Sequence, residues 1–130
     1  MKKITTIILI TVLLTSIFSC SKKDEQSDDG NIVIPSTFTP DGDGVNDTWF
    51  ITDEKNLIDP AHFLVRIFDD STHVKIFEST KKNFFWDGTY MGIPQRIGYY
   101  SYYIDYKTWN DQEHLRTGSI WLYRKPPPAK

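Results

Sequence analysis

Hydrophobic and polar residues alternate along most of the chain after residue 31, with the two-residue period of half-buried β-strands. The clearest runs are Ala61–Phe68 and Tyr99–Trp109, where aromatic and aliphatic residues recur at every second position. Shorter runs predict further strands, in chain order Ile32–Ile34, Thr48–Thr52, Val74–Glu78, Phe84–Trp86 and Leu115–Tyr123. The polar segment Asp53–Pro60 is expected to form a loop or one short turn.

The spacing of these runs predicts an all-β fold. Outside the first 20 residues, no run has the period of an amphipathic helix. About six to eight short strands, with a turn roughly every 8–12 residues, are typical of an antiparallel β-sandwich. We expect that sandwich to occupy residues 32–124 as one domain of the 130-residue chain.

The first 20 residues resemble an export signal. Lys2 and Lys3 precede the apolar run Ile4–Phe18, which is too short to cross a hydrocarbon core of about 30 Å comfortably. The run ends in Ile17-Phe-Ser-Cys20, which resembles a bacterial lipobox and predicts a lipid on Cys20. The alternative is an ordinary signal peptide, in which Cys20 has no special role.

Two segments beside the sandwich carry too few apolar residues to form a core. Residues 21–31 are polar and charged, so we expect a flexible tether. Its acidic residues resemble the surface-export signal of Bacteroidetes lipoproteins, although a plain spacer would have the same composition. Residues 125–130 are rich in proline and predict a semi-rigid or disordered tail.

Composition narrows the class of protein. Cys20 is the single cysteine, so the domain has no disulfide of its own and depends on its hydrophobic core for stability. Aromatic residues make up 15% of the chain and can bury a large area in that core. The net charge is −2, and it becomes more negative when Lys2 and Lys3 leave with the signal. An acidic surface argues against nucleic acid as a partner.

The acidic loop Asp41-Gly-Asp-Gly-Val-Asn-Asp47 carries the clearest candidate for a cofactor. Carboxylates at Asp41, Asp43 and Asp47, with the backbone carbonyl of Val45, have the spacing of half a calcium site. Asn46 could supply a further ligand from the loop, and Asp53, Glu54 or Asp87 could complete the shell from elsewhere in the fold. The alternative is a metal-free loop whose aspartates accept hydrogen bonds from nearby backbone N–H groups.

Residue types that commonly form catalytic sites are scattered along the sequence. No Ser–His–Asp set, phosphate-binding loop or nucleophilic cysteine is visible, and His62, His73 and His114 lie far apart in the sequence. An enzyme is therefore not expected. Alternation leaves Tyr99 and Tyr103 on the outer face beside Trp121 and Tyr123, where they could stack on a sugar or simply pack together.

Six blocks of sequence, in order, resemble the gliding motility-associated C-terminal domain of Bacteroidetes, which is the type B sorting domain of the type IX secretion system. They are Phe38–Asp47, Val65–Phe68, Val74–Ser79, Trp86–Tyr90, Gly98–Ile104 and Gly118–Leu122. The resemblance covers about Ile32 to Arg124. It implies an immunoglobulin-like β-sandwich that directs large exported proteins through the outer membrane and retains them at the surface.

Three differences from the family change the expected role. The domain makes up nearly the whole mature chain, a tail extends past its last strand, and a lipobox precedes it. We therefore expect a non-enzymatic lipoprotein of the outer membrane and cell surface, held by its lipid, that binds or supports envelope proteins. The alternative is a sorting-type element or accessory subunit that docks to the type IX secretion apparatus.

Overall fold

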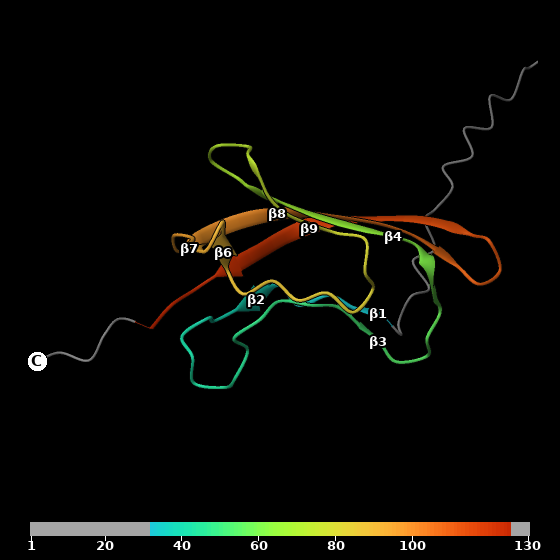
Figure 1. Ribbon diagram of the computed structural model, residues 1–130, viewed down its shortest axis with the longest axis horizontal. Coiled ribbons are helices and arrows are strands. Elements are labelled where there is room, and N and C mark those ends of the chain that lie inside the picture. The colour runs from blue at the N-terminus through green and yellow to red at the C-terminus, as the bar shows by residue number, and fades with distance from the viewer. Residues whose placement is uncertain (1–31, 126–130) are drawn as a thin grey trace, which may run out of the picture.

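The computed structural model describes residues 32–125, which form a β-sandwich (Figure 1). Within this range there are nine strands and no helix. The strands are β1 (Ile32–Val33), β2 (Thr37–Phe38), β3 (Thr52–Asp53), β4 (Ile58–Asp69), β5 (Lys75–Ser79), β6 (Thr89–Tyr90), β7 (Ile93–Pro94), β8 (Gly98–Thr108) and β9 (Glu113–Leu122). The structure therefore confirms the predicted fold class.

One layer is a five-stranded sheet in the order β2-β9-β8-β4-β5. Its centre consists of two antiparallel ladders, in which β8 pairs with β4 on one side and with β9 on the other. The predicted alternation is confirmed on β4, where Phe63, Val65 and Ile67 are buried. On β8, Tyr100 and Ile104 are buried in the same way.

The opposing layer is small and irregular. It contains the antiparallel pair β1–β3 and the extended segments around Trp49 and Trp86, which lie below the sheet in Figure 1. Trp49 and Trp86 exchange two backbone hydrogen bonds of 2.8 and 2.9 Å. Their indole N–H groups donate to the carbonyls of Pro35 and Thr89, so both rings are buried without an unsatisfied donor.

The chain passes from one layer to the other at Pro35. β1 pairs with β3, and two residues after Pro35 the chain pairs with the end of β9 in a parallel register, with Thr37 opposite Trp121. Among the described strands, β2–β9 is the one parallel pair of an otherwise antiparallel sandwich. The crossing places Phe38 in the core against Trp86, with ring centroids 5.1 Å apart.

The structure also corrects several boundaries. Only Trp49, as an isolated bridge, and Thr52 pair within the predicted strand Thr48–Thr52. The predicted loop Asp53–Pro60 contains the start of β4, because buried Ile58 pairs with Thr108. The described residues form nine strands, one more than the upper end of the predicted range. The two-residue strands β2, β6 and β7 are too short to leave a periodic pattern in the sequence.

Within residues 32–125, no helix has the length and apolar character needed to cross a bilayer.

Candidate functional site

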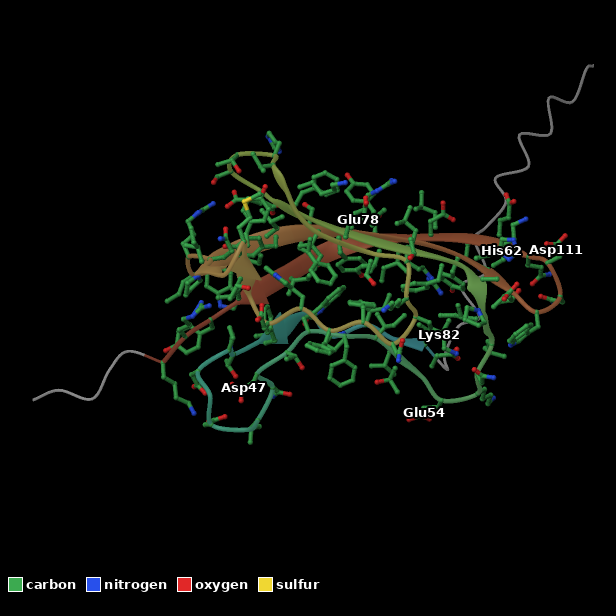
Figure 2. The ribbon with its side chains drawn as sticks, viewed as in Figure 1. Asp47, Glu54, His62, Glu78, Lys82 and Asp111 are labelled. Atoms are coloured by element: carbon green, nitrogen blue, oxygen red, sulfur yellow. The ribbon has the colours of Figure 1, made fainter. Side chains whose placement is uncertain are left out.

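The acidic loop lies between β2 and Trp49, at the opposite end of the molecule from the β8–β9 turn at Asp111 (Figure 2). The backbone N–H of Thr39 donates to the carbonyl of Asn46 over 2.8 Å and closes the loop. Gly42 and Gly44 have φ angles of 79° and 85°, which glycine adopts without strain. These two glycines therefore supply the positive φ angles that the tight wrap of the loop requires.

The loop brings its three aspartates together. One side-chain oxygen from each of Asp41, Asp43 and Asp47 can be chosen so that all lie within 4.8 Å of one another. Three carboxylates at this separation can share a hard cation such as calcium, which prefers oxygen ligands. Of the residues predicted to hold metal, these three are assembled in the structure.

Asp47 organises the loop from within. Its Oδ1 accepts hydrogen bonds from the backbone N–H groups of Asp41 at 3.0 Å and Gly42 at 2.7 Å, and its Oδ2 accepts one from Gly44 at 2.7 Å. This is the geometry of the metal-free alternative. These hydrogen bonds do not exclude a metal ion, because Oδ2 of Asp47 accepts only one of them and keeps a lone pair for a cation.

Lys125 supplies a cation to the loop from the far end of the chain. Its Nζ lies 2.7 Å from Oδ2 of Asp43 and 3.4 Å from Oδ2 of Asp41. The hydrogen bond from Lys125, together with the backbone N–H of Val45, holds the pKa of Asp43 below its usual range. Asp43 in turn raises the pKa of Lys125. A bound metal ion would therefore compete with Lys125.

The remaining predicted ligands are placed differently. The structure does not bring Asp87 into the cluster: its Oδ1 accepts from the backbone N–H of Thr89 at 3.0 Å and from the Thr89 hydroxyl. The Val45 carbonyl lies 3.4 Å from the Thr39 hydroxyl, and the Asn46 carbonyl accepts the bond that closes the loop. Cys20, the predicted lipid site, lies outside the described residues.

Asp53 has a structural role instead of a metal-binding one. Its carboxylate accepts from the N–H groups of Leu57 and Ile58 at 2.8 and 3.0 Å and pairs with Lys82 at 2.8 Å. Although burial acts to raise the pKa of Asp53, the hydrogen bonds from Lys82 and the backbone lower it overall. The carboxylate thus fixes the turn that leads into β4.

A buried carboxylate that the sequence pattern did not indicate, Asp69, lies at the end of β4. Its Oδ1 accepts from Ser71 through both N–H and hydroxyl, from the N–H of Thr72, and from the Arg96 guanidinium at 2.8 Å. Burial opposes the charge on Asp69, yet these donors hold its pKa well below the usual range. Because Arg96 lies 27 residues away, nothing in the local pattern indicates the pair.

The histidines serve separate local contacts. Nδ1 of His62 lies 2.7 Å from a carboxylate oxygen of Asp59, and the ring of His114 stacks on Tyr106 with centroids 4.9 Å apart. His73 occupies the turn before β5 with a φ angle of 57°. The three residues therefore do not converge on one site.

Together, the fold and the loop define a small all-β module with an acidic surface loop. A family model, the CHU_C type IX secretion signal domain, matches residues 32–123, which is nearly all of the part that the structure describes. The chain belongs to this family. The match confirms the resemblance found in the sequence and indicates a cell-envelope or secreted protein related to type IX secretion. No curated protein matches the chain.

Proposed function

We propose that the protein is a lipid-anchored module of the outer membrane, displayed at the cell surface, that binds or supports other envelope proteins. The observation that carries this proposal is the order of segments: a basic start, an apolar run ending at Cys20, an acidic tether and then a type IX secretion domain. Two or more acyl chains on Cys20 would hold the domain durably, because each buried CH₂ contributes about 0.8 kcal/mol.

The chemistry of the described side chains supports a non-enzymatic role. The clustered carboxylates Asp41 and Asp43 are paired with Lys125, and Asp47 accepts backbone N–H groups. The buried carboxylate Asp69 is held by Arg96 and the adjacent turn. A general acid or base acts on a substrate held beside it, whereas these carboxylates are engaged with Lys125, Arg96 and backbone N–H groups of the fold.

Replacing the predicted lipid site tests the anchor. We expect Cys20→Ala to move the protein from the membrane fraction to the soluble fraction after cell lysis. Ser19→Thr, a control that keeps the cysteine, should leave the protein in the membrane. Protease treatment of intact cells should remove the native domain if it is displayed outside; retention of Cys20→Ala in membranes would contradict the lipid anchor.

Docking to the type IX secretion apparatus is a second candidate, favoured by the family match over residues 32–123. In this case, deletion of the type IX translocon should abolish cleavage by external protease while total protein remains. If surface display continues without the translocon, the domain reaches the surface by another route, and the docking role fails while the lipid-anchored role stands.

A further inference from the structure

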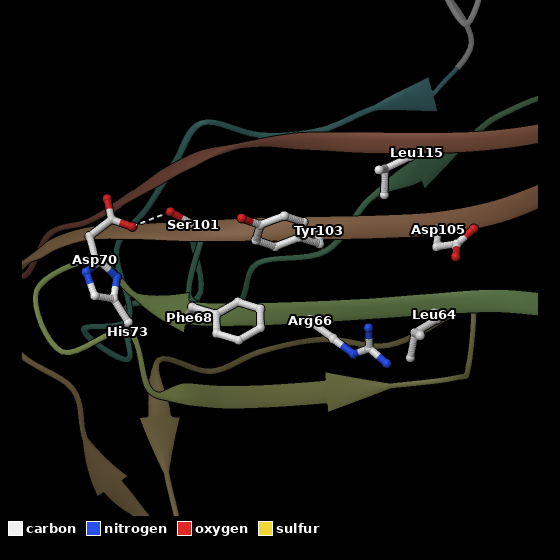
Figure 3. A pocket seen from close by; sticks show the side chains of 9 residues that line it. All are labelled: Leu64, Arg66, Phe68, Asp70, His73, Ser101, Tyr103, Asp105 and Leu115. Carbon is white, nitrogen blue, oxygen red and sulfur yellow. Dashed lines mark hydrogen bonds between the residues drawn. The ribbon is translucent and has the colours of Figure 1, made fainter.

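The outer face of the five-stranded sheet carries a hollow that none of the roles above uses. It has a volume of about 460 Å³ and lies over β4, β8 and β9 (Figure 3). We call it the outer hollow. Its lining includes Phe68, Asp70, Ser101, Tyr103, Asp105 and Leu115.

The floor of the outer hollow is apolar and partly exposed. The rings of Phe68 and Tyr103 meet at 82° with centroids 5.4 Å apart, and Tyr103 is 46% exposed. Leu115, opposite Asp105 on the next strand, is 58% exposed. Because backbone groups between β4, β8 and β9 already pair with one another, an occupant must bind through side-chain contacts with this floor.

A carboxylate lies at each end of this floor. Asp70 accepts a hydrogen bond from the Ser101 hydroxyl at one end, and Asp105 lies at the other end, as Figure 3 shows. Ser101 and Asp105 are four residues apart on β8, which corresponds to about 13 Å. Within residues 32–125 neither aspartate forms an ion pair, whereas nearby Arg66 is paired with Glu78 at 2.8 Å. The outer hollow is therefore acidic at both ends.

The tail of the chain has the complementary pattern. Residues 125–130 read Lys-Pro-Pro-Pro-Ala-Lys, with a lysine at each end and apolar residues between. In an extended polyproline conformation the two lysines lie about 15 Å apart, close to the separation of the two acidic ends. Proline-rich segments dock on aromatic grooves because their conformation is already restricted before binding.

We propose that the outer hollow binds the tail, residues 125–130, of a second copy of this chain. The tail cannot fill the hollow of its own chain. Lys125 lies three residues beyond Leu122, which pairs with Gly98 at the start of β8. Asp105 lies seven residues after Gly98, or about 24 Å further along β8. The five residues after Lys125 span at most about 18 Å. Contacts of this kind link copies head to tail and do not depend on the lipid anchor.

In the linked copies, Lys125 exchanges its partners at the acidic loop for a carboxylate of the neighbouring hollow. The exchange costs little, because the Lys125 side chain is 63% exposed and exposed ion pairs contribute little to stability. The packing of the prolines on Tyr103 and Phe68 then supplies the attraction, and the charges select the segment.

The test uses a fluorescent hexapeptide that has the sequence of residues 125–130. The full chain, in detergent, is titrated into this peptide, and binding is measured as a rise in fluorescence anisotropy. We expect saturable binding that Tyr103→Ala weakens about fivefold and Asp105→Lys about threefold or more. Asp111→Lys is the matched control, because it makes the same charge change at an 87% exposed site on the β8–β9 turn, and it should bind as the native chain does.

A charge exchange makes the test specific. A hexapeptide with both lysines replaced by glutamate should not bind the native chain and should bind Asp105→Lys. Thermal melts establish that each variant is folded. If Tyr103→Ala does not fold, Leu115→Arg replaces it, because an arginine in the outer hollow should also abolish binding of the hexapeptide. Absence of peptide binding at millimolar chain, or equal binding by Asp105→Lys and Asp111→Lys, would overturn the proposal.

Discussion

The contact between Gly118 on β9 and Tyr102 on β8 gives a sharp test of the sheet register. The two residues are directly opposite each other. A Cβ atom at Gly118 would lie 2.5 Å from Oη, 2.7 Å from Cζ and 2.8 Å from Cε1 of Tyr102. The ring has limited freedom to move, because it packs on fully buried Trp49 with centroids 5.4 Å apart.

We expect Gly118→Ala to lower the free energy of unfolding by about 1–2 kcal/mol. Overpacking of this kind costs about 1–3 kcal/mol, and the replacement of glycine within a strand offsets about 0.5–1 kcal/mol of that cost. For a domain of this size, the midpoint of thermal unfolding should fall by roughly 5–10 °C. Circular dichroism during heating and urea titration measures both quantities.

A second background separates the clash from the glycine itself. In Tyr102→Val the ring is absent, so adding Gly118→Ala should raise the free energy of unfolding by about 0.5–1 kcal/mol. The sign of the effect thus reverses between the two backgrounds. If Gly118→Ala stabilises the native chain, or destabilises both backgrounds equally, Tyr102 does not cover Gly118 and the β8–β9 register is wrong.

Three further predictions concern the loops. If Asp41–Asp47 binds calcium, millimolar calcium should raise the midpoint of thermal unfolding relative to chelator, and more so in Lys125→Ala; an unchanged midpoint would exclude the metal. Asp69→Ala should cost about 2–4 kcal/mol in urea unfolding. Because the pKa of Asp69 lies below its ordinary value of 3.8, its contribution is complete above about pH 4 and declines below it, so Asp69→Asn should flatten the acid limb of the stability curve. Gly88→Ala should cost about 2–4 kcal/mol, because φ is 76° and the new Cβ would lie 2.9 Å from Pro40, whereas Gly92→Ala, with φ of 77° and open space, should cost only about 1 kcal/mol in the same assay.

The long strands could be predicted from sequence because their burial has a two-residue period. On β8, Tyr100, Ile104 and Tyr106 are buried while Tyr99 and Tyr103 are exposed, as alternation requires. The acidic loop could also be predicted, since Asp41, Asp43 and Asp47 are close in sequence and the glycines between them permit a tight wrap.

Features that depend on distant residues could not be predicted. The parallel contact of Thr37 with Trp121 joins two segments 84 residues apart and leaves no local pattern. The same is true of Lys125 at the acidic loop, 82 residues from Asp43. The start of β4 was missed for another reason: Ile58 is followed by Asp59 and Pro60, whose loop preference is overridden by the burial of Ile58 against the sheet.

The most direct test of the proposed lipid-anchored role is the intact mass of the mature protein purified from membranes. The proposal predicts a chain that begins at Cys20 and carries a diacylglyceryl group on its sulfur, with or without a further acyl chain on its amine. Fragmentation should place the added mass on the first residue. A mature chain that begins at another residue, or that begins at Cys20 with a free thiol, would contradict the proposal.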